Sequence, residues 1–310
     1  MIPNSRLILG PPGCGKTYRL IQEIEKALTS GVHPSRIGVI SFTRKAIEEM
    51  ITRACSQFQL EAKDFPFMRT SHSLGFHGLG LNPEDVMKLA DYKAIGDPIG
   101  LSFEKEDSLD LDDGLRTPNM GGTGQDYLQI DSRARYRMVS LEDEFSATKN
   151  FNLFYAKAVQ FRETLNEYKR ATSKVDFIDM IENYIALGEY PNLDYLFVDE
   201  AQDFTPLQWE MVKGMSEYAD KVIIAGDDDQ AVHRWTGVDV DLFIESSENV
   251  ELLTQSYRIP RRVHELAESI SSRIYGRIEK KFNPREELGS VEYVYYMDQI
   301  PFQEGSWTVM

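Results

Sequence analysis

The stretch Gly10-Pro11-Pro12-Gly13-Cys14-Gly15-Lys16-Thr17 decides the fold of this chain. It fits the pattern G-x-x-x-x-G-K-[ST] of a phosphate-binding loop. The apolar run at 7–9 predicts a buried strand before the loop, and the helical spacing of apolar residues at 18–30 predicts a helix after it. Strand, glycine-rich loop and helix are the context in which such a loop binds nucleotide phosphates.

Two side chains at the end of this loop predict a bound metal–nucleotide complex. Lys16 can reach the β- and γ-phosphates, and the hydroxyl of Thr17 can hold Mg²⁺. Glycines let backbone N–H groups turn toward phosphate oxygens, and the start of the helix adds partial positive charge. We expect the whole loop to bind the nucleotide, through Gly10, Pro11, Pro12, Gly13, Cys14, Gly15, Lys16 and Thr17.

Composition and charge limit the class of protein. The 310 residues are 42% apolar, which is enough for a real core, and the length allows one to three domains. A net charge of −16 argues mildly against nucleic acid as a partner, because DNA-binding proteins often carry a basic face. The acidity is uneven, since residues 96–131 hold nine acidic and two basic residues. A local basic groove can coexist with this balance.

The two cysteines and the lack of long apolar runs indicate the compartment. Cys14 lies inside the loop, where a disulfide would distort the phosphate site, and it forms no metal-binding spacing with Cys55. A reducing compartment is the simpler interpretation. The sequence has no signal peptide and no apolar run of about 18 residues, so we expect no membrane partner. The expected location is cytoplasmic.

Further patterns extend the order of strands and helices. Residues 37–42 predict a second buried strand, and Thr43 opens an amphipathic helix that runs to Cys55. Later strands are predicted at 195–198, 222–225 and 250–253. Alternating strands and helices predict a parallel sheet with helices on its faces.

Two regions depart from this alternation. Residues 75–135 are rich in Gly, Pro and Asp, which predicts an inserted region with a long, mobile, acidic loop. Helical spacing returns over 140–170. Near the end of the sequence we expect a helix at 261–275 and strands at 291–296 and 307–310. No internal repeat is visible.

Acidic and amide side chains follow two of the predicted strands. Asp199 and Glu200 end the strand at 195–198, at the edge where open α/β sheets bind ligands. Asp199 can hold Mg²⁺ and Glu200 can activate an attacking water, unless both only cap the next helix. Gln230 follows the next strand and can sense the γ-phosphate, or it belongs to an Asp-rich turn. Trp235 is either a core anchor or a stacking platform.

Taken in order, these segments resemble the motifs of superfamily 1 DNA helicases of the UvrD/PcrA/Rep type. The matching segments are the phosphate loop, Ser41-Phe42-Thr43-Arg44-Lys45-Ala46 (motif Ia), Thr70-Ser71-His72-Ser73 (Ib), Val175-Asp176-Phe177-Ile178-Asp179-Met180 (return to the core), Val198-Asp199-Glu200-Ala201-Gln202-Asp203 (II), Gly226 to Gly237 (III) and Gln255-Ser256-Tyr257-Arg258 (IV). Each short motif is modest evidence, but seven in the same order over about residues 7–275 are strong evidence.

The resemblance implies roles in ATP turnover. The implied catalytic residues are Lys16, Asp199, Glu200, Gln230 and Arg258. Arg258 would be an arginine finger, and Gln230 would couple the state of the γ-phosphate to the DNA site. Tyr257 would stack on the adenine, while Thr17 and Asp199 would hold Mg²⁺.

The resemblance also implies a track for single-stranded DNA. The implied residues are Phe42, Thr43, Arg44, Lys45, His72 and Trp235. Aromatic rings would stack on bases without sequence preference, and cationic and hydroxyl groups would meet phosphates. Two alternatives stay open: Phe42 as a core residue and His72 as a structural histidine.

The implied fold class is α/β: a P-loop RecA-like parallel sheet with flanking helices, a mainly helical inserted subdomain and the start of a second RecA-like domain. We expect the ATP-binding domain at 1–74 and 171–260, the insertion at 75–170 and an incomplete second domain at 261–310. Three features depart from the family. Few residues precede Gly10, so an adenine-recognition segment is absent or short. His233 and Thr236 stand where motif III usually has tyrosine and arginine, and motifs V and VI are not readable.

These observations lead to one main hypothesis and one alternative. We expect an ATP-dependent DNA helicase or translocase, 3′-to-5′, that acts on single-stranded DNA and single/double-strand junctions in repair or replication. Turnover would be weak because the sequence ends before motifs V and VI. The alternative is a non-catalytic ATP- or DNA-binding module, or half of a split helicase that acts through a partner chain. A phosphate-loop kinase is disfavoured by the segments around Gln230 and Arg258.

Overall fold

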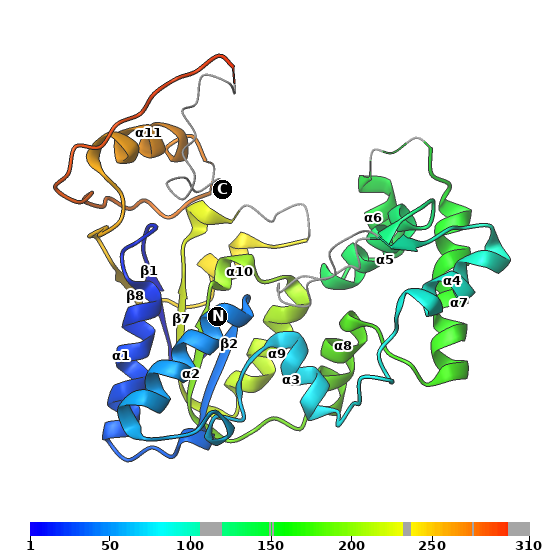
Figure 1. Ribbon diagram of the computed structural model, residues 1–310, viewed down its shortest axis with the longest axis horizontal. Helices are drawn as coiled ribbons and strands as arrows, with labels where there is room; N and C mark the ends of the chain where they lie inside the picture. The colour runs from blue at the N-terminus through cyan, green and yellow to red at the C-terminus, as the bar shows by residue number, and fades with distance from the viewer. Residues whose placement is uncertain (106–119, 149, 151, 232–236, 275, 297–310) are drawn as a thin grey trace.

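A six-stranded parallel sheet lies at the centre of the computed structural model, with helices on both faces (Figure 1). The structure describes residues 1–105, 120–148, 150, 152–231, 237–274 and 276–296. The strand order is β3-β2-β6-β7-β1-β8. The strands are β1 (Ser5–Leu9), β2 (Ile37–Ser41), β3 (Met68–Thr70), β6 (Leu193–Asp199), β7 (Ala219–Gly226) and β8 (Val250–Leu252). The expected α/β class with a parallel sheet is confirmed.

The helices form three groups. Around the sheet lie α1 (Lys16–Thr29), α2 (Arg44–Phe58), α3 (Ser71–Gly78), α8 (Phe177–Leu187), α9 (Pro206–Ser216) and α10 (Val240–Ile244). The insertion holds α4 (Leu89–Gly96), α5 (Gln125–Tyr136), α6 (Leu141–Ala147) and α7 (Tyr155–Thr172), with a short antiparallel pair, β4 (Glu104–Lys105) and β5 (Met120–Gly121). Beyond β8 lies α11 (Arg261–Ser271). Short 3-10 turns are η1 (Pro34–Arg36), η2 (Ala62–Asp64), η3 (Asp97–Ile99), η4 (Ala201–Asp203) and η5 (Asp228–Gln230).

The central strands are apolar on both faces because both faces are covered. In β1, Leu7 and Leu9 belong to the core cluster that includes residues of α8 and α9, whereas Ile8 belongs to the cluster formed with α1 and α2. In β6, Val198 packs in the first cluster and Phe197 in the second. A doubly covered parallel strand therefore reads as a short continuous apolar run, the pattern that predicted these strands.

Side-chain caps fix where the helices begin. The Thr43 hydroxyl accepts a hydrogen bond from the backbone N–H of Ala46 at 3.4 Å, so Thr43 is the N-cap of α2. The helix itself begins at Arg44 and ends at Phe58, three residues beyond the predicted end at Cys55. Short polar side chains satisfy N–H groups that have no partner within the first turn.

The inserted helices form a core of their own. Phe103, Leu128 and Phe161, from three parts of the insertion, lie in one cluster of buried apolar residues. The helical spacing expected over 140–170 corresponds to two separate helices, α6 and α7. Helix α5 lies inside the region expected to be loop, and its residues Tyr127, Leu128 and Ile130 belong to this core. Residues 106–119, the centre of the expected mobile acidic loop, lie outside the described residues.

The two ends of the insertion meet. Val86 and Val175 form a parallel β-bridge, in which the Met87 N–H donates to the Val175 carbonyl at 2.9 Å. The Val175 N–H donates to the Asp85 carbonyl at 2.9 Å. The chain therefore leaves the sheet-bearing part and returns to it at one place.

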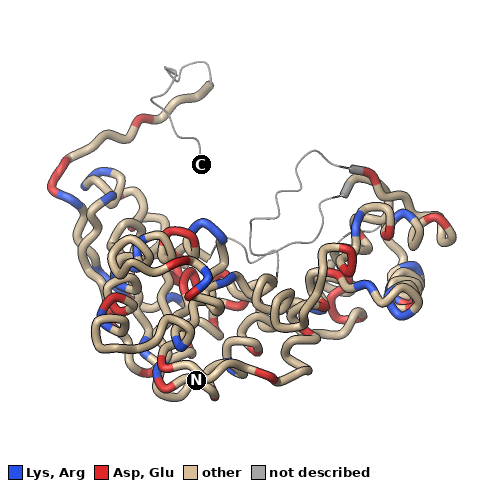
Figure 2. The backbone as a smooth tube through the Cα atoms, turned by 60° about the horizontal axis from the view of Figure 1, so that its bottom comes forward, with Lys and Arg blue, Asp and Glu red and all other residues tan. Residues whose placement is uncertain are grey.

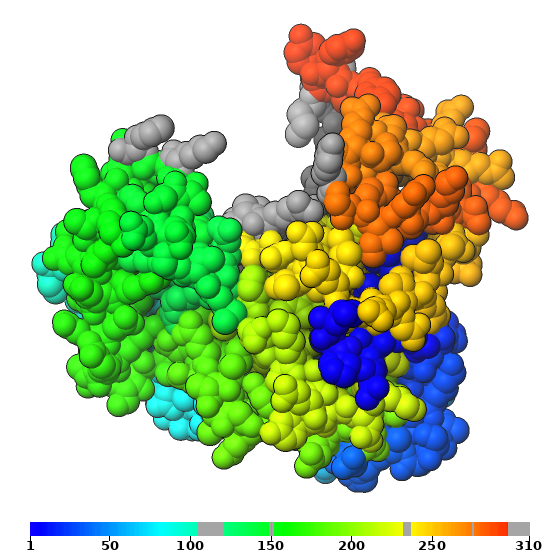
Figure 3. All heavy atoms as spheres, turned by 180° about the vertical axis from the view of Figure 1, so that it is seen from behind, coloured from blue at the N-terminus to red at the C-terminus, as the bar shows by residue number. Residues whose placement is uncertain are grey.

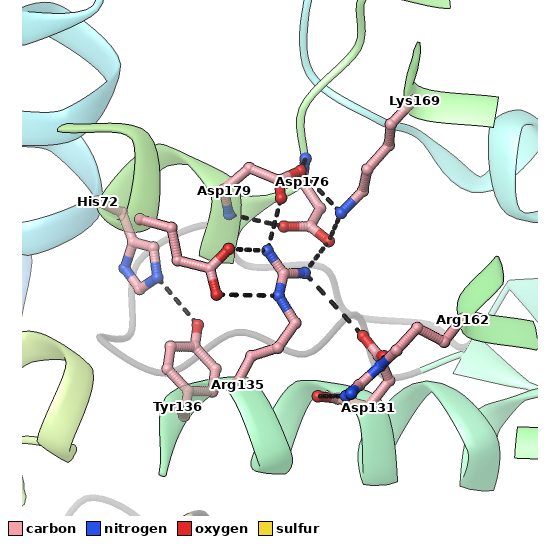
Figure 4. Close-up of polar contacts among 9 residues, drawn as sticks. His72, Asp131, Arg135, Tyr136, Arg162, Lys169, Asp176 and Asp179 are labelled. Atoms are coloured by element: carbon pink, nitrogen blue, oxygen red, sulfur yellow. Dashed lines mark hydrogen bonds and ion pairs between the residues drawn. The ribbon is translucent and has the colours of Figure 1, made fainter. Parts of the chain in front are cut away.

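A buried ionic network joins the insertion to the helices beside the sheet (Figure 4). Arg135 of α5 lies 2.7 Å from an oxygen of Asp176 and 2.5 Å from one of Asp179, and Lys169 lies 2.6 Å and 2.7 Å from the same two carboxylates. Burial alone would raise the pKa of Asp176, but Arg135 and Lys169 hold it well below its usual range. Each buried charge in this network has an opposite charge in contact, which is the condition for burying it.

The C-terminal segment differs from expectation. Helix α11 ends at Ser271, four residues before the predicted end. The predicted strand at 291–296 is wrong: these residues are described without strand structure, and Tyr293 is exposed. A strand needs a neighbour for its ladder hydrogen bonds, and no described strand pairs with this segment. The strand expected at 307–310 lies outside the described residues.

We predict that Gly75→Ala destabilises the protein, although alanine favours helices over glycine. A Cβ at Gly75 in α3 would lie 2.3 Å from the backbone oxygen of Met180 in α8. Overpacking two helices in this way costs about 1–3 kcal/mol. Urea unfolding of Gly75→Ala should show that loss, while the exposed control Ser56→Ala in α2 should stay within about 0.5 kcal/mol of wild type. Equal stability of the two variants would contradict this packing.

We also predict that Arg135→Met weakens the junction strongly. The substitution keeps an apolar chain but leaves the carboxylates of Asp176 and Asp179 without their main counter-charge. Breaking a buried pair by removing one partner costs about 3–5 kcal/mol. The matched control is Arg170→Met, at an exposed position of the neighbouring helix α7. Chemical unfolding followed by circular dichroism checks the result, and a loss no larger than the control's would show that the network contributes little.

Candidate nucleotide site

The register of the sheet brings the predicted site residues to one edge. Leu9, the last residue of β1, pairs with Gly226 of β7, and Ser41 of β2 pairs with Asp199 of β6. On the other side of β2, Ser41 also pairs with Thr70 of β3. Because all strands run in the same direction, the segments that follow them emerge together at the carboxyl edge.

The phosphate loop turns sharply at two glycines. Gly13 and Gly15 have φ values of 72° and 87°, in the left-handed region that favours glycine. A Cβ at Gly13 would lie 2.2 Å from the Cβ of Arg258, so the loop and the Arg258 backbone are in close approach. Gly15 is the N-cap of α1. The N-terminus of that helix, with its partial positive charge, therefore lies directly after the loop.

Lys16 and Thr17, the first two residues of α1, make polar contacts within and beyond the phosphate loop. The ammonium of Lys16 is buried and donates to the carbonyl of Gly10 at 2.9 Å. The Thr17 hydroxyl donates to Oδ2 of Asp199 at 3.1 Å, although the two residues are 182 positions apart. The structure therefore brings together the two residues that the sequence suggested as Mg²⁺ ligands.

Two buried carboxylates that follow the apolar part of β6 carry raised pKa values. Burial raises the pKa of Asp199 to about 7, and the charge of Glu200 adds to the rise. Burial and then Glu200 raise the pKa of Asp203 to about 7 as well. Among the described residues, Oδ1 of Asp203 has no hydrogen-bond partner. Lys16 opposes the rise at Asp199, whereas no described cation opposes it at Asp203. Carboxylates with raised pKa values are typical of functional sites.

Gln202 links the acids after β6 to the turn after β7, a role that the sequence did not suggest. Its amide nitrogen donates to Oε2 of Glu200 at 2.9 Å and to Oδ2 of Asp203 at 3.2 Å. Its amide oxygen accepts from the Asp227 N–H at 3.0 Å, and Oδ2 of Asp227 accepts from Gln230 at 2.6 Å. The expected base Glu200 and the expected sensor Gln230 are thus joined through two residues. Glu200 has a positive φ of 49°, and its side chain makes no capping hydrogen bond to η4. The alternative in which Glu200 only caps the next helix expected such a bond.

The segment Gln255-Ser256-Tyr257-Arg258 packs on the phosphate loop. The buried Ser256 hydroxyl donates to the Pro12 carbonyl at 2.8 Å and accepts from the Arg258 N–H at 3.4 Å. The Tyr257 N–H donates to the Gly13 carbonyl at 2.9 Å, while the residue as a whole is 74% exposed. Sequence reasoning missed Ser256, which fastens the expected adenine-stacking and transition-state residues to the loop.

The residues expected to bind DNA are dispersed among different environments. Phe42 is buried and belongs to the core cluster that includes residues of α8 and α9. Thr43 caps α2, and Arg44 and Lys45 are exposed in its first turn at the carboxyl edge. His72 is 9% exposed, and its Nε2 lies 3.0 Å from the Tyr136 hydroxyl at the junction with the insertion (Figure 4). These DNA-binding roles stay predictions.

Other features of the expected motif III lie outside the described residues. Trp235, His233 and Thr236 all fall within 232–236. Their expected roles therefore stay predictions. Basic and acidic positions are interspersed over the described chain in the view of Figure 2. Seen from behind, the inserted helices and the C-terminal segment rise on either side of a hollow (Figure 3).

In the part of the chain that the structure describes, no helix combines the length and apolar character needed to cross a bilayer.

Comparison with known proteins gives a consistent result. The family model described as UvrD/REP helicase N-terminal domain matches residues 2–251. The chain is 25% identical to the ATP-dependent DNA helicase PcrA of Leuconostoc citreum, over 97% of this chain and 41% of that protein. It is 26% identical to PcrA of Bacillus subtilis (97% and 42%) and 22% identical to the ATP-dependent DNA helicase Rep of Buchnera aphidicola subsp. Baizongia pistaciae (92% and 43%). The chain therefore spans about two fifths of the length of these relatives.

The family match covers most of the chain and agrees with the structure. It includes the phosphate loop, the acids after β6 and the turn after β7. The six-stranded parallel sheet with flanking helices is the fold that the motif order implied. The resemblance drawn from the motifs is confirmed, and this chain belongs to the UvrD/REP helicase N-terminal domain family.

Proposed function

We propose that this chain binds and hydrolyses ATP as part of an ATP-dependent helicase or translocase that moves 3′-to-5′ on single-stranded DNA. The observation that carries the proposal is the hydrogen bond from Thr17 to Asp199 at the end of the phosphate loop. It joins the loop to the acids of the second motif in one site. The names of the relatives, all ATP-dependent DNA helicases, support the same activity.

Each residue around the loop has a chemical role in this proposal. The Lys16 ammonium would leave the Gly10 carbonyl to bind the β- and γ-phosphates. Glu200 would accept the proton of the attacking water, held in place by Gln202. Gln230 would hydrogen-bond the γ-phosphate, and Arg258 would stabilise the charge of the transition state.

The residues present fit Mg²⁺. A hydroxyl and a carboxylate 3.1 Å apart are hard oxygen ligands, and Mg²⁺ is usually held by one or two such groups together with substrate phosphates and water. Among the described residues no group of three or more His, Cys, Asp or Glu side chains forms a separate metal site. Thr17 and Asp199 would hold the ion, which would neutralise charge on the phosphates. A cation there would also favour the ionised form of the buried Asp199.

The adenine and the DNA would bind on the exposed side of this edge. The exposed ring of Tyr257 is free to stack on a base, which supports its adenine-binding role. Arg44 and Lys45, in the first turn of α2, would contact phosphates of single-stranded DNA or of a single/double-strand junction. A step in DNA repair or replication, and a reducing cytoplasmic setting for the free thiols of Cys14 and Cys55, complete the proposal.

A partner chain is the second part of the proposal. The relatives are more than twice as long as the part that this chain matches. We propose that a C-terminal helicase half, or another protein, completes the nucleotide cleft for full activity. The alternative function, a non-catalytic ATP- or DNA-binding module, predicts nucleotide binding without turnover, and the experiments below separate the two.

We predict that Lys16→Ala and Glu200→Gln each abolish ATP turnover stimulated by single-stranded DNA. Loss of a general base lowers a rate by about 10²–10⁴-fold, and Glu200→Gln should fall in that range. The control is Lys26→Ala, an exposed lysine in the last turn of the same helix as Lys16 and therefore at the far edge of the sheet. Phosphate release measured with and without oligonucleotide provides the test. ATP binding with no response to DNA would favour the non-catalytic module.

We predict that replacing Arg44 and Lys45 by alanine weakens binding to single-stranded DNA of any sequence. Log affinity falls as log salt concentration rises, and each lost phosphate contact should make this negative slope shallower by about 0.7. Lys63→Ala is the control, because this exposed lysine precedes β3 and so lies at the opposite edge of the sheet. Fluorescence anisotropy at several salt concentrations gives the slope. An unchanged slope in the double variant would remove the start of α2 from the DNA site.

A further inference from the structure

A buried lysine from beyond the sheet neutralises the aspartates that follow β7. The side chain of Lys280 is 4% exposed, and its ammonium lies 3.1 Å from Oδ1 of Asp227 and 2.9 Å from Oδ2 of Asp229. It also contacts Oδ1 of Asp228, whose side chain is as deeply buried as that of Asp227. Burying an ammonium is costly unless carboxylates surround it, and three adjacent carboxylates repel one another unless a cation lies between them. The residues 227–229, here called the aspartate turn, therefore depend on Lys280.

Lys280 and Gln230 hold opposite oxygens of one carboxylate. Oδ1 of Asp227 faces the Lys280 ammonium, and Oδ2 accepts from the Gln230 amide at 2.6 Å. The backbone N–H of Asp227 donates to Gln202, which in turn holds Glu200. Lys280 therefore fixes the orientation of the Asp227 carboxylate. Gln230, expected to meet the γ-phosphate, and Glu200, expected to activate the attacking water, both depend on that orientation.

The segment that carries Lys280 touches the aspartate turn at further points. The Arg277 guanidinium lies 2.7 Å from Asp229, and the Ile278 N–H donates to Oδ2 of Asp228 at 2.7 Å. Ile278 also packs against the core cluster formed with α8 and α9. Residues 277–285 are here called the strap. Through these contacts the strap packs against the aspartate turn.

The other end of the strap holds the segment that carries Arg258. The Asn283 N–H donates to the Thr254 carbonyl at 2.7 Å, and the Ser256 N–H donates to the Asn283 carbonyl at 2.8 Å. Gln255 and Asn283 form a parallel β-bridge there. The strap therefore connects the aspartate turn at one end with the segment packed on the phosphate loop at the other.

We propose that Lys280 is a positioning residue of the nucleotide site: it fixes Asp227, and through Asp227 and the strap it sets Gln230, Glu200 and Arg258 in one arrangement around the γ-phosphate. The inference rests on the proposed ATP turnover and adds to it a residue outside the recognised motifs. The Lys280 ammonium is held by the three carboxylates of the aspartate turn and not by the phosphate loop. Its loss should therefore spare ground-state binding by the loop and slow the chemical step.

The test compares Lys280→Met with Lys281→Met. The two lysines are adjacent, but Lys281 is exposed. In Lys280→Met, ATP turnover at saturating ATP should fall by roughly ten- to a hundredfold, the effect of small misplacement of catalytic groups, while KM stays within about threefold. Lys281→Met should match wild type in both quantities. Equal turnover in the two variants would overturn the proposal.

A double variant separates positioning from stability. Lys280→Met leaves buried carboxylates uncompensated and should lower the thermal midpoint, and Lys280→Met/Asp228→Asn removes one of these charges and should recover much of that midpoint. Because Asp227 still lacks its cation, turnover should remain low in the double variant. If turnover returns together with the thermal midpoint, Lys280 has only a structural role and the proposal is wrong.

A readout without turnover keeps this test distinct from that of the proposed function. Hydrogen exchange of the backbone over 226–231 should be faster in Lys280→Met than in Lys281→Met, with exchange in the phosphate loop unchanged. Unchanged exchange over 226–231 would overturn the positioning role whatever the turnover. Wild-type protein that hydrolyses no ATP, or a Lys16→Ala variant as active as wild type, would instead contradict the proposed function.

Discussion

The parallel register of the sheet is the constraint on which the candidate site depends. Thr17, Asp199 and Asp227 come from distant parts of the sequence, and they reach one edge of the sheet because β1, β6 and β7 end there. A shift of one residue in β6 would turn Asp199 to the opposite face of the sheet, away from Thr17. The apolar residues on both faces prevent such a shift, since it would exchange the two sets of core contacts. Packing inside the sheet therefore determines the chemistry at its edge.

Buried acids are treated in two different ways in this molecule. At the junction with the insertion and in the aspartate turn, each buried carboxylate has a cation in contact: Arg135 and Lys169 in the first, Lys280 in the second. Beside the phosphate loop, burial and Glu200 raise the pKa of Asp199 and Asp203, and the described residues bring no comparable cation close to Asp203. Carboxylates kept without protein counter-charges are costly, and such a cost is typical of sites that receive a cation or a proton during function.

The sequence could predict what local pattern and strand order determine. Short apolar runs predicted β1, β2, β6 and β7, and the rule that ligands bind at the carboxyl ends of strands predicted that Thr17 and Asp199 would meet. Helix α5 was missed because Gly and Pro residues around it obscured its spacing, and its core lies within the insertion. The strand expected at 291–296 failed because β propensity requires a pairing partner. Lys280 could not be found, since an ion pair across 52 residues leaves no periodic signal.

The bridge between Val86 and Val175 has a consequence for how the chain folds and diverges. Because the insertion begins and ends at one hydrogen-bonded point, the sheet-bearing part is topologically almost continuous across it. The entropy of closing a loop grows only with the logarithm of its length, so lengthening or shortening the inserted helices changes the cost of assembling the sheet very little. With its own apolar core, the insertion can acquire and lose sequence as a separate unit of evolution while the nucleotide edge keeps its geometry.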